Sequence, residues 1–556
     1  MSDKLTYEVL AEAFIAEGVE KHFSLSGDAN MYFCHALAHR NVEMIHARHE
    51  HCAVAMADGY YRATGKVGTA STTCGPGFTQ IATALTMAAR GNIPLVVFAG
   101  DSPTNASFHV QYLDPGPLTA TTGAHYINIR NMDRLLDNVR EAFYVAQHER
   151  KPVVLNVPVD FQRKPFPHLV KYRPSSTLLP APQRLHPDPR MIDLAVEEIL
   201  AAKNPIILAG RGAAWSGATQ DVIELGDRIG ALFATSLLGK DQFDNVPFSI
   251  GTAGAFATTR ARELWAEADL VIGVGAGLGH YTTEGGYLFP NARVVAIDTN
   301  PRGLFQGLRV ADLHIRSDAR AAVQAILREL RKRNHTHQGV RTNALAGELA
   351  TIMKTPDPQK FPPRPNVVDP REAIRALDEM IPKDWEIVTG SAHFFSIALT
   401  HLSGRDCRRY HVINDFGAIG SGLADAIGVA AGKGDGKVLL IEGDGSMMMH
   451  IQELETIARQ GIKLLMCVMN DGGYASEAHK FKAQGMDTSE AMHGRGNLEG
   501  VARAFGLRAA TVKSLAGLKT LLDGYQAGNA GELWDFHVDE EIPSALFRRV
   551  HFGQIV

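Results

Sequence analysis

Two acidic, glycine-rich stretches follow apolar runs late in the chain. The tripeptide GDG at 443–445 follows "KVLLIE", and NDGG at 470–473 closes "IKLLMCVMNDGG". If both runs are neighbouring parallel strands, Asp444 and Asp471 enter the same crevice at the carboxyl edge of the sheet. Mg²⁺ prefers octahedral oxygen ligands, usually one or two carboxylates together with phosphate oxygens. The spacing therefore predicts a metal site made by Asp444, Asp471 and the backbone carbonyl of Gly473.

The same stretch also suits a diphosphate beside the metal. Gly443 and Gly445 let a diphosphate approach the backbone. We expect a helix after Ser446, whose N-terminus favours negative charge. Taken alone, GDG is more typical of a simple turn. The second acidic loop, at the exit of the next apolar run, favours the metal–diphosphate interpretation.

Parallel sheets must position these loops. Short β-branched runs that end in glycine or an acid alternate with helical patterns along the whole chain, as in "IPLVVFAGD", "ADLVIGVGAG" and "KVLLIEGDG". Such near-continuous apolar strands are typical of parallel sheets covered on both faces. Two proline-rich stretches, 163–190 and 354–370, suit linkers. The sequence predicts an α/β protein with three doubly wound parallel-sheet domains, at 1–170, 188–333 and 366–545.

Composition excludes several other classes of protein. Of 556 residues, 45% are hydrophobic, and the net charge of −4 favours neither nucleic acid nor an anionic membrane as a partner. No stretch reaches the roughly 18 apolar residues of a membrane span, and the first residues lack an apolar signal core. Five scattered cysteines argue against a disulfide framework or a zinc cluster. We expect a cytoplasmic protein that acts on a small molecule.

The paired loops resemble the thiamine diphosphate (ThDP) motif of the family of acetolactate synthase, benzoylformate decarboxylase and pyruvate decarboxylase. This family usually has Asn-Asn where the chain has Asn470-Asp471. A second stretch, 45–85, looks like the family's pyrimidine-side domain, and the resemblance covers nearly all of the chain. It implies ThDP and Mg²⁺ as cofactors, and pyrimidine-binding, central and diphosphate-binding roles for the three domains in chain order.

The resemblance assigns the central acid of the cofactor site. Glu50 matches the family's glutamate, which bonds the aminopyrimidine ring and stabilises its imino form, so that a ring nitrogen accepts the thiazolium C2 proton. In the family this contact crosses a dimer interface. The resemblance therefore implies a homodimer or homotetramer with active sites at the dimer interface.

Further cofactor residues are implied in the same way. Ile419 matches the bulky residue that bends the cofactor, and the carbonyl of Gly417 would hold the pyrimidine amine. From the residues alone, Ile419 is more typical of core packing and Ser391 of a helix cap. The complete implied set of cofactor-binding residues is Glu50, Gly390, Ser391, Ala392, Gly417, Ile419, Gly443, Asp444, Gly445, Ser446, Asp471, Gly473 and Tyr474.

The substrate side combines features of two enzymes. Asp28 and Glu477 match two acids of pyruvate decarboxylase, but of its adjacent histidine pair only His109 is present. Gln111 instead matches a glutamine of acetolactate synthases and benzaldehyde lyase. These four residues are the candidate catalytic residues beside Glu50. The alternatives are a turn aspartate, a helix-start glutamate and a surface-loop glutamine.

The histidines around Glu50 could also suggest a zinc site. His46, His49 and His51 flank this acid, but the order is H-x-x-H-E-H and not the H-E-x-x-H that places two histidines on one helical face. We predict no metal from this run of residues.

The predicted activity is a ThDP- and Mg²⁺-dependent C–C lyase or ligase. It decarboxylates a 2-oxo acid and transfers the acyl carbanion to an aldehyde, a ketone or a proton. One alternative is a C–C cleaving hydrolase or lyase that acts on a diketone or acyloin. Another is a flavin-containing relative such as a 2-oxo acid oxidase, although no clear G-x-G-x-x-G motif supports FAD. The presence of Glu50, Asp444 and Ile419 argues against a non-catalytic scaffold.

Overall fold

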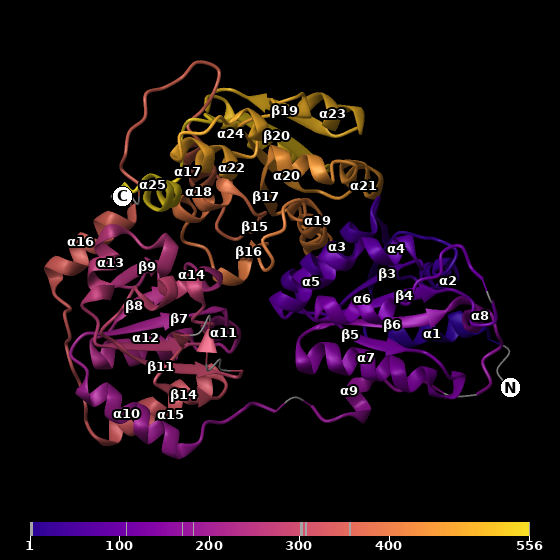
Figure 1. The fold of residues 1–556 in the computed structure, drawn as a ribbon, viewed down its shortest axis with the longest axis horizontal. Helices are drawn as coiled ribbons and strands as arrows, with labels where there is room; N and C mark the ends of the chain where they lie inside the picture. Colours follow the sequence, from indigo (N-terminus) through magenta and orange to yellow (C-terminus); the bar gives the residue numbers. More distant parts are fainter. Residues whose placement is uncertain are drawn as a thin grey trace.

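Three six-stranded sheets organise the chain (Figure 1). The computed structural model describes residues 4–106, 108–168, 171–181, 183–300, 304–305, 308–354 and 357–554. Every neighbouring pair of strands within the three sheets is parallel, and helices flank the sheets. The predicted fold class is confirmed. The exact domain limits, 1–170, 188–333 and 366–545, stay a prediction.

The N-terminal sheet has the strand order β2-β1-β3-β4-β6-β5. Its strands are β1 Lys21–Ser24, β2 Glu43–His46, β3 Gly68–Thr72, β4 Leu95–Asp101, β5 His125–Asn128 and β6 Pro152–Pro158. Its main helices are α1 Thr6–Ala16, α2 Met31–Ala38, α3 Glu50–Thr64, α5 Ala82–Gly91, α6 Pro115–Thr122 and α7 Leu135–Glu149. The short helix α4 Pro76–Gln80 precedes α5.

The central sheet has the order β14-β11-β10-β7-β8-β9. Its strands are β7 Pro205–Ala209, β8 Leu232–Thr235, β9 Ser249–Thr252, β10 Leu270–Val274, β11 Arg293–Asp298 and β14 Leu313–Arg316. The longer helices around it are α10 Pro189–Ala201, α12 Thr219–Ile229, α13 Thr259–Ala266, α15 Ala319–Lys332 and α16 Asn343–Lys354.

The C-terminal sheet has the order β16-β15-β17-β18-β20-β19. Its strands are β15 Glu386–Thr389, β16 Tyr410–Val412, β17 Val438–Gly443, β18 Leu465–Asn470, β19 Arg508–Val512 and β20 Glu532–His537. Its helices are α17 Pro370–Met380, α18 His393–His401, α19 Gly422–Lys433, α20 Asp444–Met449, α21 Glu453–Gln460, α22 Ala475–Ala483, α23 Leu498–Ala504, α24 Leu518–Ala527 and α25 Ala545–Phe552. Numbered from its own first strand, this order is the same as that of the N-terminal sheet.

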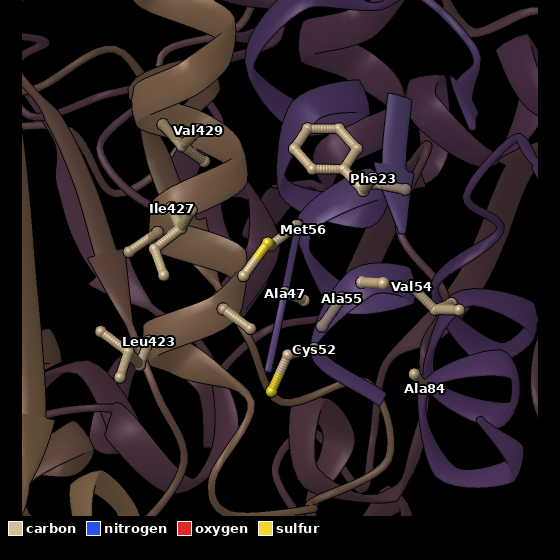
Figure 2. Packing of buried hydrophobic residues seen from close by; sticks show 14 of the residues in the cluster. Phe23, Ala47, Cys52, Val54, Ala55, Met56, Ala84, Leu423, Ile427 and Val429 are labelled. Atoms are coloured by element: carbon tan, nitrogen blue, oxygen red, sulfur yellow. The ribbon is translucent and has the colours of Figure 1, made fainter. Parts of the chain in front are cut away.

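Helices α3 and α19 join the N-terminal and C-terminal sheets in one hydrophobic core (Figure 1). Both helices are rich in alanine and glycine, so their backbones come unusually close. A Cβ atom at Gly59 would lie 2.0 Å from the carbonyl oxygen of Asp425, and one at Gly428 would lie 1.9 Å from that of Met56. Figure 2 shows Met56 of α3 beside Ile427 of α19. This seam fixes how the two candidate cofactor motifs face each other.

Local signals explain where α3 begins and ends. Its first residue is Glu50, because the Nδ1 atom of His49 accepts a hydrogen bond from the backbone N–H of His51 at 3.1 Å and caps the helix. It ends at Thr64, and the next residue, Gly65, caps it with a left-handed φ of 72° that suits glycine. Within the described residues, no helix is both long and apolar enough to cross a membrane.

Candidate active site

Asp444 and Asp471 leave two adjacent strands at the same edge of the sheet. Strands β17 and β18 pair in parallel, with Gly443 opposite Met469, as the sequence predicted. Asp444 is only 2% exposed. Its Oδ2 atom has no hydrogen-bond partner among the residues that the structure describes, and Nε2 of His493 lies 3.8 Å away from it. A buried carboxylate oxygen without a partner is unfavourable in the absence of a cation, so this position fits a bound metal ion.

The electrostatics of the two aspartates favour a cation between them. Burial raises the pKa of Asp444 to about 6, although His493 and backbone N–H groups oppose this shift. Burial, and then the negative charge of Asp444, raise the pKa of Asp471 well above its usual range. The N–H of Gly473 donates to Oδ1 of Asp471 at 3.2 Å. Two carboxylates beside backbone carbonyls form the hard oxygen donor set that Mg²⁺ prefers.

The helix that follows Gly443 differs from the prediction. We expected it to begin after Ser446, but α20 begins at Asp444 and is only six residues long. A break follows, because Nδ1 of His450 donates to the carbonyl of Gly420 at 2.8 Å and ties the end of α20 to the loop before α19. Oγ of Ser446 accepts from the N–H of Gly420 at 2.7 Å. The expected single helix is therefore two, α20 and α21.

Residues 491–494 hold the second acidic loop in place. The N–H groups of His493 and Gly494 both donate to the carbonyl of Gly472 at 2.9 Å, and the N–H of Tyr474 donates to Ala491 at 2.8 Å. The ring of Tyr474 covers Gly445, since a Cβ atom there would lie 2.8 Å from its Cε1 atom. Sequence reasoning missed this segment, because nothing in its local pattern marks a partner 20 residues upstream.

A buried acid lies behind the other cofactor loop. Gly390, Ser391 and Ala392 connect β15 to α18, and Oγ of Ser391 donates to Oδ1 of Asn414 at 2.8 Å. A Cβ atom at Gly390 would lie 2.2 Å from the carboxyl group of Glu442, which is fully buried. Burial raises the pKa of Glu442 to about 8. Sequence reasoning also missed this acid. Only glycine at position 390 leaves room for its carboxyl group.

The start of α3 meets the Ile419 loop within the single chain. Nε2 of His51 and Oγ of Ser421 are hydrogen-bonded at 2.8 Å. Ile419 is half-buried and lies between Gly417 and Gly420, whose φ angles of 70° and 93° are left-handed. The carboxylate of Glu50 lies beside the GPG turn at 75–77, because a Cβ atom at Gly77 would be 3.2 Å from Oε1 of Glu50. The structure thus brings the end of α3 that carries Glu50 to the loop that carries Ile419.

Family models match all three sheet regions. A model described as "Thiamine pyrophosphate enzyme, N-terminal TPP binding domain" matches residues 5–115, the corresponding central domain matches 192–326, and the C-terminal TPP binding domain matches 390–530. The chain belongs to the thiamine pyrophosphate enzymes. Thiamine diphosphate is therefore its cofactor, and it is an enzyme of the carboligase and decarboxylase type.

Curated relatives of this ThDP enzyme are similar over most of their length. A probable acetolactate synthase large subunit of Methanococcus aeolicus is 30% identical, over 84% of this chain and 80% of the relative. The acetolactate synthase large subunit of Haemophilus influenzae is 27% identical, over 84% and 82%. An acetolactate synthase of Arthrospira platensis is 28% identical, over 91% and 89%. The chain is thus similar to acetolactate synthases.

The substrate candidates of the ThDP enzyme do not all lie together. Oε1 of Gln111 accepts a hydrogen bond from the Cys74 thiol at 3.4 Å, and Nδ1 of His109 accepts from the N–H of Gln111 at 3.3 Å. Burial is the main cause that raises the pKa of this cysteine, and the charges of Asp101 and, with the smallest effect, Asp28 add to it. Glu477 is exposed in the first turn of α22, where it pairs with Lys480 at 3.4 Å. No hydrogen bond or ion pair between described residues links Glu477 to Asp28.

The glycine-rich turns of the central domain have a structural explanation. The N–H of Gly212, after β7, donates to the carbonyl of Gly275, after β10, at 3.0 Å. A Cβ atom at Gly210 would lie 2.2 Å from that same carbonyl oxygen. These glycines are needed because the two loops pack against each other, so they do not argue for bound FAD.

Proposed function

We propose that this enzyme decarboxylates a 2-oxo acid and transfers the acyl carbanion to an aldehyde, a ketone or a proton, as an acetolactate-synthase-like carboligase. One observation carries the proposal. The buried Asp444, whose Oδ2 atom accepts no hydrogen bond from a described residue, and its neighbour Asp471 occupy the same sheet edge as Gly390, while the start of α3 with Glu50 contacts the Ile419 loop. The similarity to proteins named acetolactate synthase supports the same reaction class.

Each residue of this site has a defined task. When bound, thiamine diphosphate supplies a nucleophilic carbon and takes up the electrons released with CO₂. Asp444, Asp471 and the carbonyl of Gly473 would hold Mg²⁺, which binds the diphosphate. Glu50 would hold a proton at the pyrimidine nitrogen. Ile419 would support the bent cofactor, because it is wedged between two left-handed glycines.

On the substrate side, the Gln111 loop is the better supported candidate. The Cys74 thiol fixes Gln111, while Asp28 is exposed in a turn near the same cysteine. We assign Gln111 and His109 to substrate oxygen binding, and Asp28 and Glu477 to proton transfer. An amide at Gln111 donates a hydrogen bond to a carbonyl oxygen without protonating the carbanion. This supports carboligation over simple aldehyde release.

A second copy of the chain is part of the proposal. Phe108, Val110 and Tyr112 alternate with His109 and Gln111 and are 83%, 86% and 71% exposed in the single chain. Large apolar side chains gathered in this way mark an interaction surface. We propose a homodimer or homotetramer with active sites at the dimer interface. The five free, scattered cysteines suit a reducing compartment, and we propose the cytoplasm.

A substrate panel tests the function. The full chain, loaded with ThDP and Mg²⁺, is given pyruvate, benzoylformate or acetoin, with and without an acceptor aldehyde, and products are separated by chromatography. We expect CO₂ release from a 2-oxo acid and an acyloin or acetohydroxy acid as product. Cleavage of acetoin without turnover of either 2-oxo acid would contradict the proposal and favour a C–C cleaving lyase. Hydrogen peroxide formation would indicate an oxidase.

A further inference from the structure

Three side chains of the metal-ligand type converge at the seam between the N-terminal and C-terminal domains. They are His49, just before α3, Cys52 in the first turn of α3, and His450, just after α20. Their potential ligand atoms all lie within 4.8 Å of one another. His49 is the N-cap residue of α3 and Cys52 lies in its first turn, while His450 comes from the other domain. This set differs from the run of histidines at 46–51, because it includes His450, which lies about 400 positions later in the chain.

The surroundings of His450 prepare it for coordination. Its Nδ1–H donates to the carbonyl of Gly420 at 2.8 Å, so in the neutral ring Nε2 keeps a free lone pair. Its ring stacks on His51, with centroids 4.9 Å apart and an angle of 9° between the planes. Histidine ligands of metals are usually oriented by such a bond from the other ring nitrogen. His450 already has this bond.

Cys52 is also suited to a metal. It is fully buried near the carboxylate of Glu453, which accepts a hydrogen bond from the N–H of Arg48 at 2.9 Å. Coordination replaces the S–H bond by an S–metal bond, and the released proton has a neighbouring acceptor in Glu453. Thiolate and imidazole together select zinc and similar borderline ions over Mg²⁺, which prefers oxygen.

From this geometry we infer that His49, Cys52 and His450 form a second metal site, distinct from the aspartate site, that binds a zinc-class transition-metal ion. Three protein ligands leave a fourth position for water. The ion would link α3 to the α20–α21 turn and so clamp the N-terminal domain onto the C-terminal domain, next to Glu50.

Closing the site requires small local movements. Ligand atoms around tetrahedral zinc are separated by roughly 3.3–3.6 Å, given zinc–ligand bonds of about 2.0–2.3 Å. The widest separation of up to 4.8 Å must therefore shorten by about 1 Å. His49 must also exchange its bond from the His51 amide for the metal.

Cobalt(II) tests the site in the full chain, with ThDP and excess Mg²⁺ present. We expect one equivalent of Co²⁺ to produce a near-ultraviolet thiolate-to-cobalt band and the visible bands of a four-coordinate ion. Stoichiometric Zn²⁺ should abolish them. Cobalt at the aspartate site has only oxygen ligands and gives no thiolate band, so the two sites are distinguished.

Matched variants assign the ligands. Cys52→Ser should lose the thiolate band and bind Zn²⁺ more weakly by at least the 10–100-fold that loss of an outer-shell partner costs, and His450→Ala should lose the four-coordinate spectrum. Cys407→Ser, at a half-buried cysteine outside the cluster, is the control and should keep both. A wild-type enzyme without the thiolate band, or a Cys52→Ser variant that retains it, would overturn the inference.

Discussion

At the residue scale, the unpartnered Oδ2 atom of Asp444 is the feature on which the cofactor site most depends. Its pKa of about 6 means that protons compete with a cation below this value, because only the carboxylate form binds metal. We therefore expect Mg²⁺ affinity, and with it ThDP retention, to fall as the pH decreases through about 6. Calorimetric titration of Mg²⁺ in the presence of ThDP at pH 5.5 and 7.5 measures the effect.

The same residue is tested by mutation. Asp444→Asn keeps the size of the side chain but removes its charge, so we expect ThDP and Mg²⁺ to be lost on gel filtration and activity to fall by at least about 10²-fold. Asp523→Asn, on the exposed face of α24, should retain both. An Asp444→Asn enzyme that keeps its cofactor would show that the metal is bound elsewhere.

Glu442 predicts an unusual dependence of stability on pH. Its folded pKa of about 8 lies above the ordinary value of 4.5, so its contribution to stability is fully present below pH 4.5 and is lost as the pH rises to about 8. Glu442→Gln removes this titration. The free energy of unfolding in urea should rise for the variant relative to the wild type between pH 5 and pH 8, by on the order of a few kcal/mol. Parallel stability curves would mean that Glu442 is not protonated in the fold.

Glu477 distinguishes the two fates of the carbanion. If it delivers a proton, Glu477→Gln slows aldehyde release by about 10²–10⁴-fold while decarboxylation continues, so the acyloin share rises when an acceptor aldehyde is present. The ratio of aldehyde to acyloin is measured at equal substrate turnover, and Glu490→Gln serves as a surface control. An unchanged ratio would mean that Glu477 is only a helix-start residue paired with Lys480 and does not deliver the proton.

At the element scale, the crossing of α3 and α19 controls how the two cofactor motifs face each other. Gly59→Ala places a methyl group 2.0 Å from a backbone carbonyl of α19, which must move. We expect a loss of about 1–3 kcal/mol in the free energy of unfolding and weaker ThDP binding. Gly347→Ala in α16 is the control, since its Cβ would meet nothing within 4 Å, and should be neutral or stabilising by up to about 1 kcal/mol. Equal effects in both variants would contradict a tight crossing.

The parts of the site that could be predicted are those marked by a local sequence pattern, and the parts that could not depend on contacts between residues far apart in the chain. The strands β17 and β18 and the loops with Asp444 and Asp471 could be predicted, because each loop directly follows an apolar run. The break at His450 could not, because it depends on a bond to the carbonyl of Gly420. Glu442 and residues 491–494 were missed for the same reason, because their partners also lie far away in the sequence. The Cys52–His450 cluster joins two domains, and no local pattern marks it.

At the scale of the whole molecule, mixing two inactive variants tests where the active site is assembled. Glu50→Gln and Asp444→Ala subunits are unfolded, mixed and refolded together. If Glu50 serves the partner's cofactor, hybrid dimers contain one intact site, and about a quarter of wild-type activity returns. Each variant refolded alone is the control. A mixture without activity would indicate that the contact between α3 and the Ile419 loop builds the site within one chain.

The shared strand order of the first and third sheets has an evolutionary consequence. Duplication of one six-stranded domain, with the central domain inserted between the copies, would leave this arrangement, with one copy facing the other across α3 and α19. Under the proposed function the two domains differ in their chemistry, since one carries Glu50 for the pyrimidine ring and the other carries Asp444 and Asp471 for the metal. The seam between the two domains therefore resembles the interface of a homodimer contained in one polypeptide, and a larger residue at Gly59 or Gly428 in one domain requires the backbone of the other domain to move.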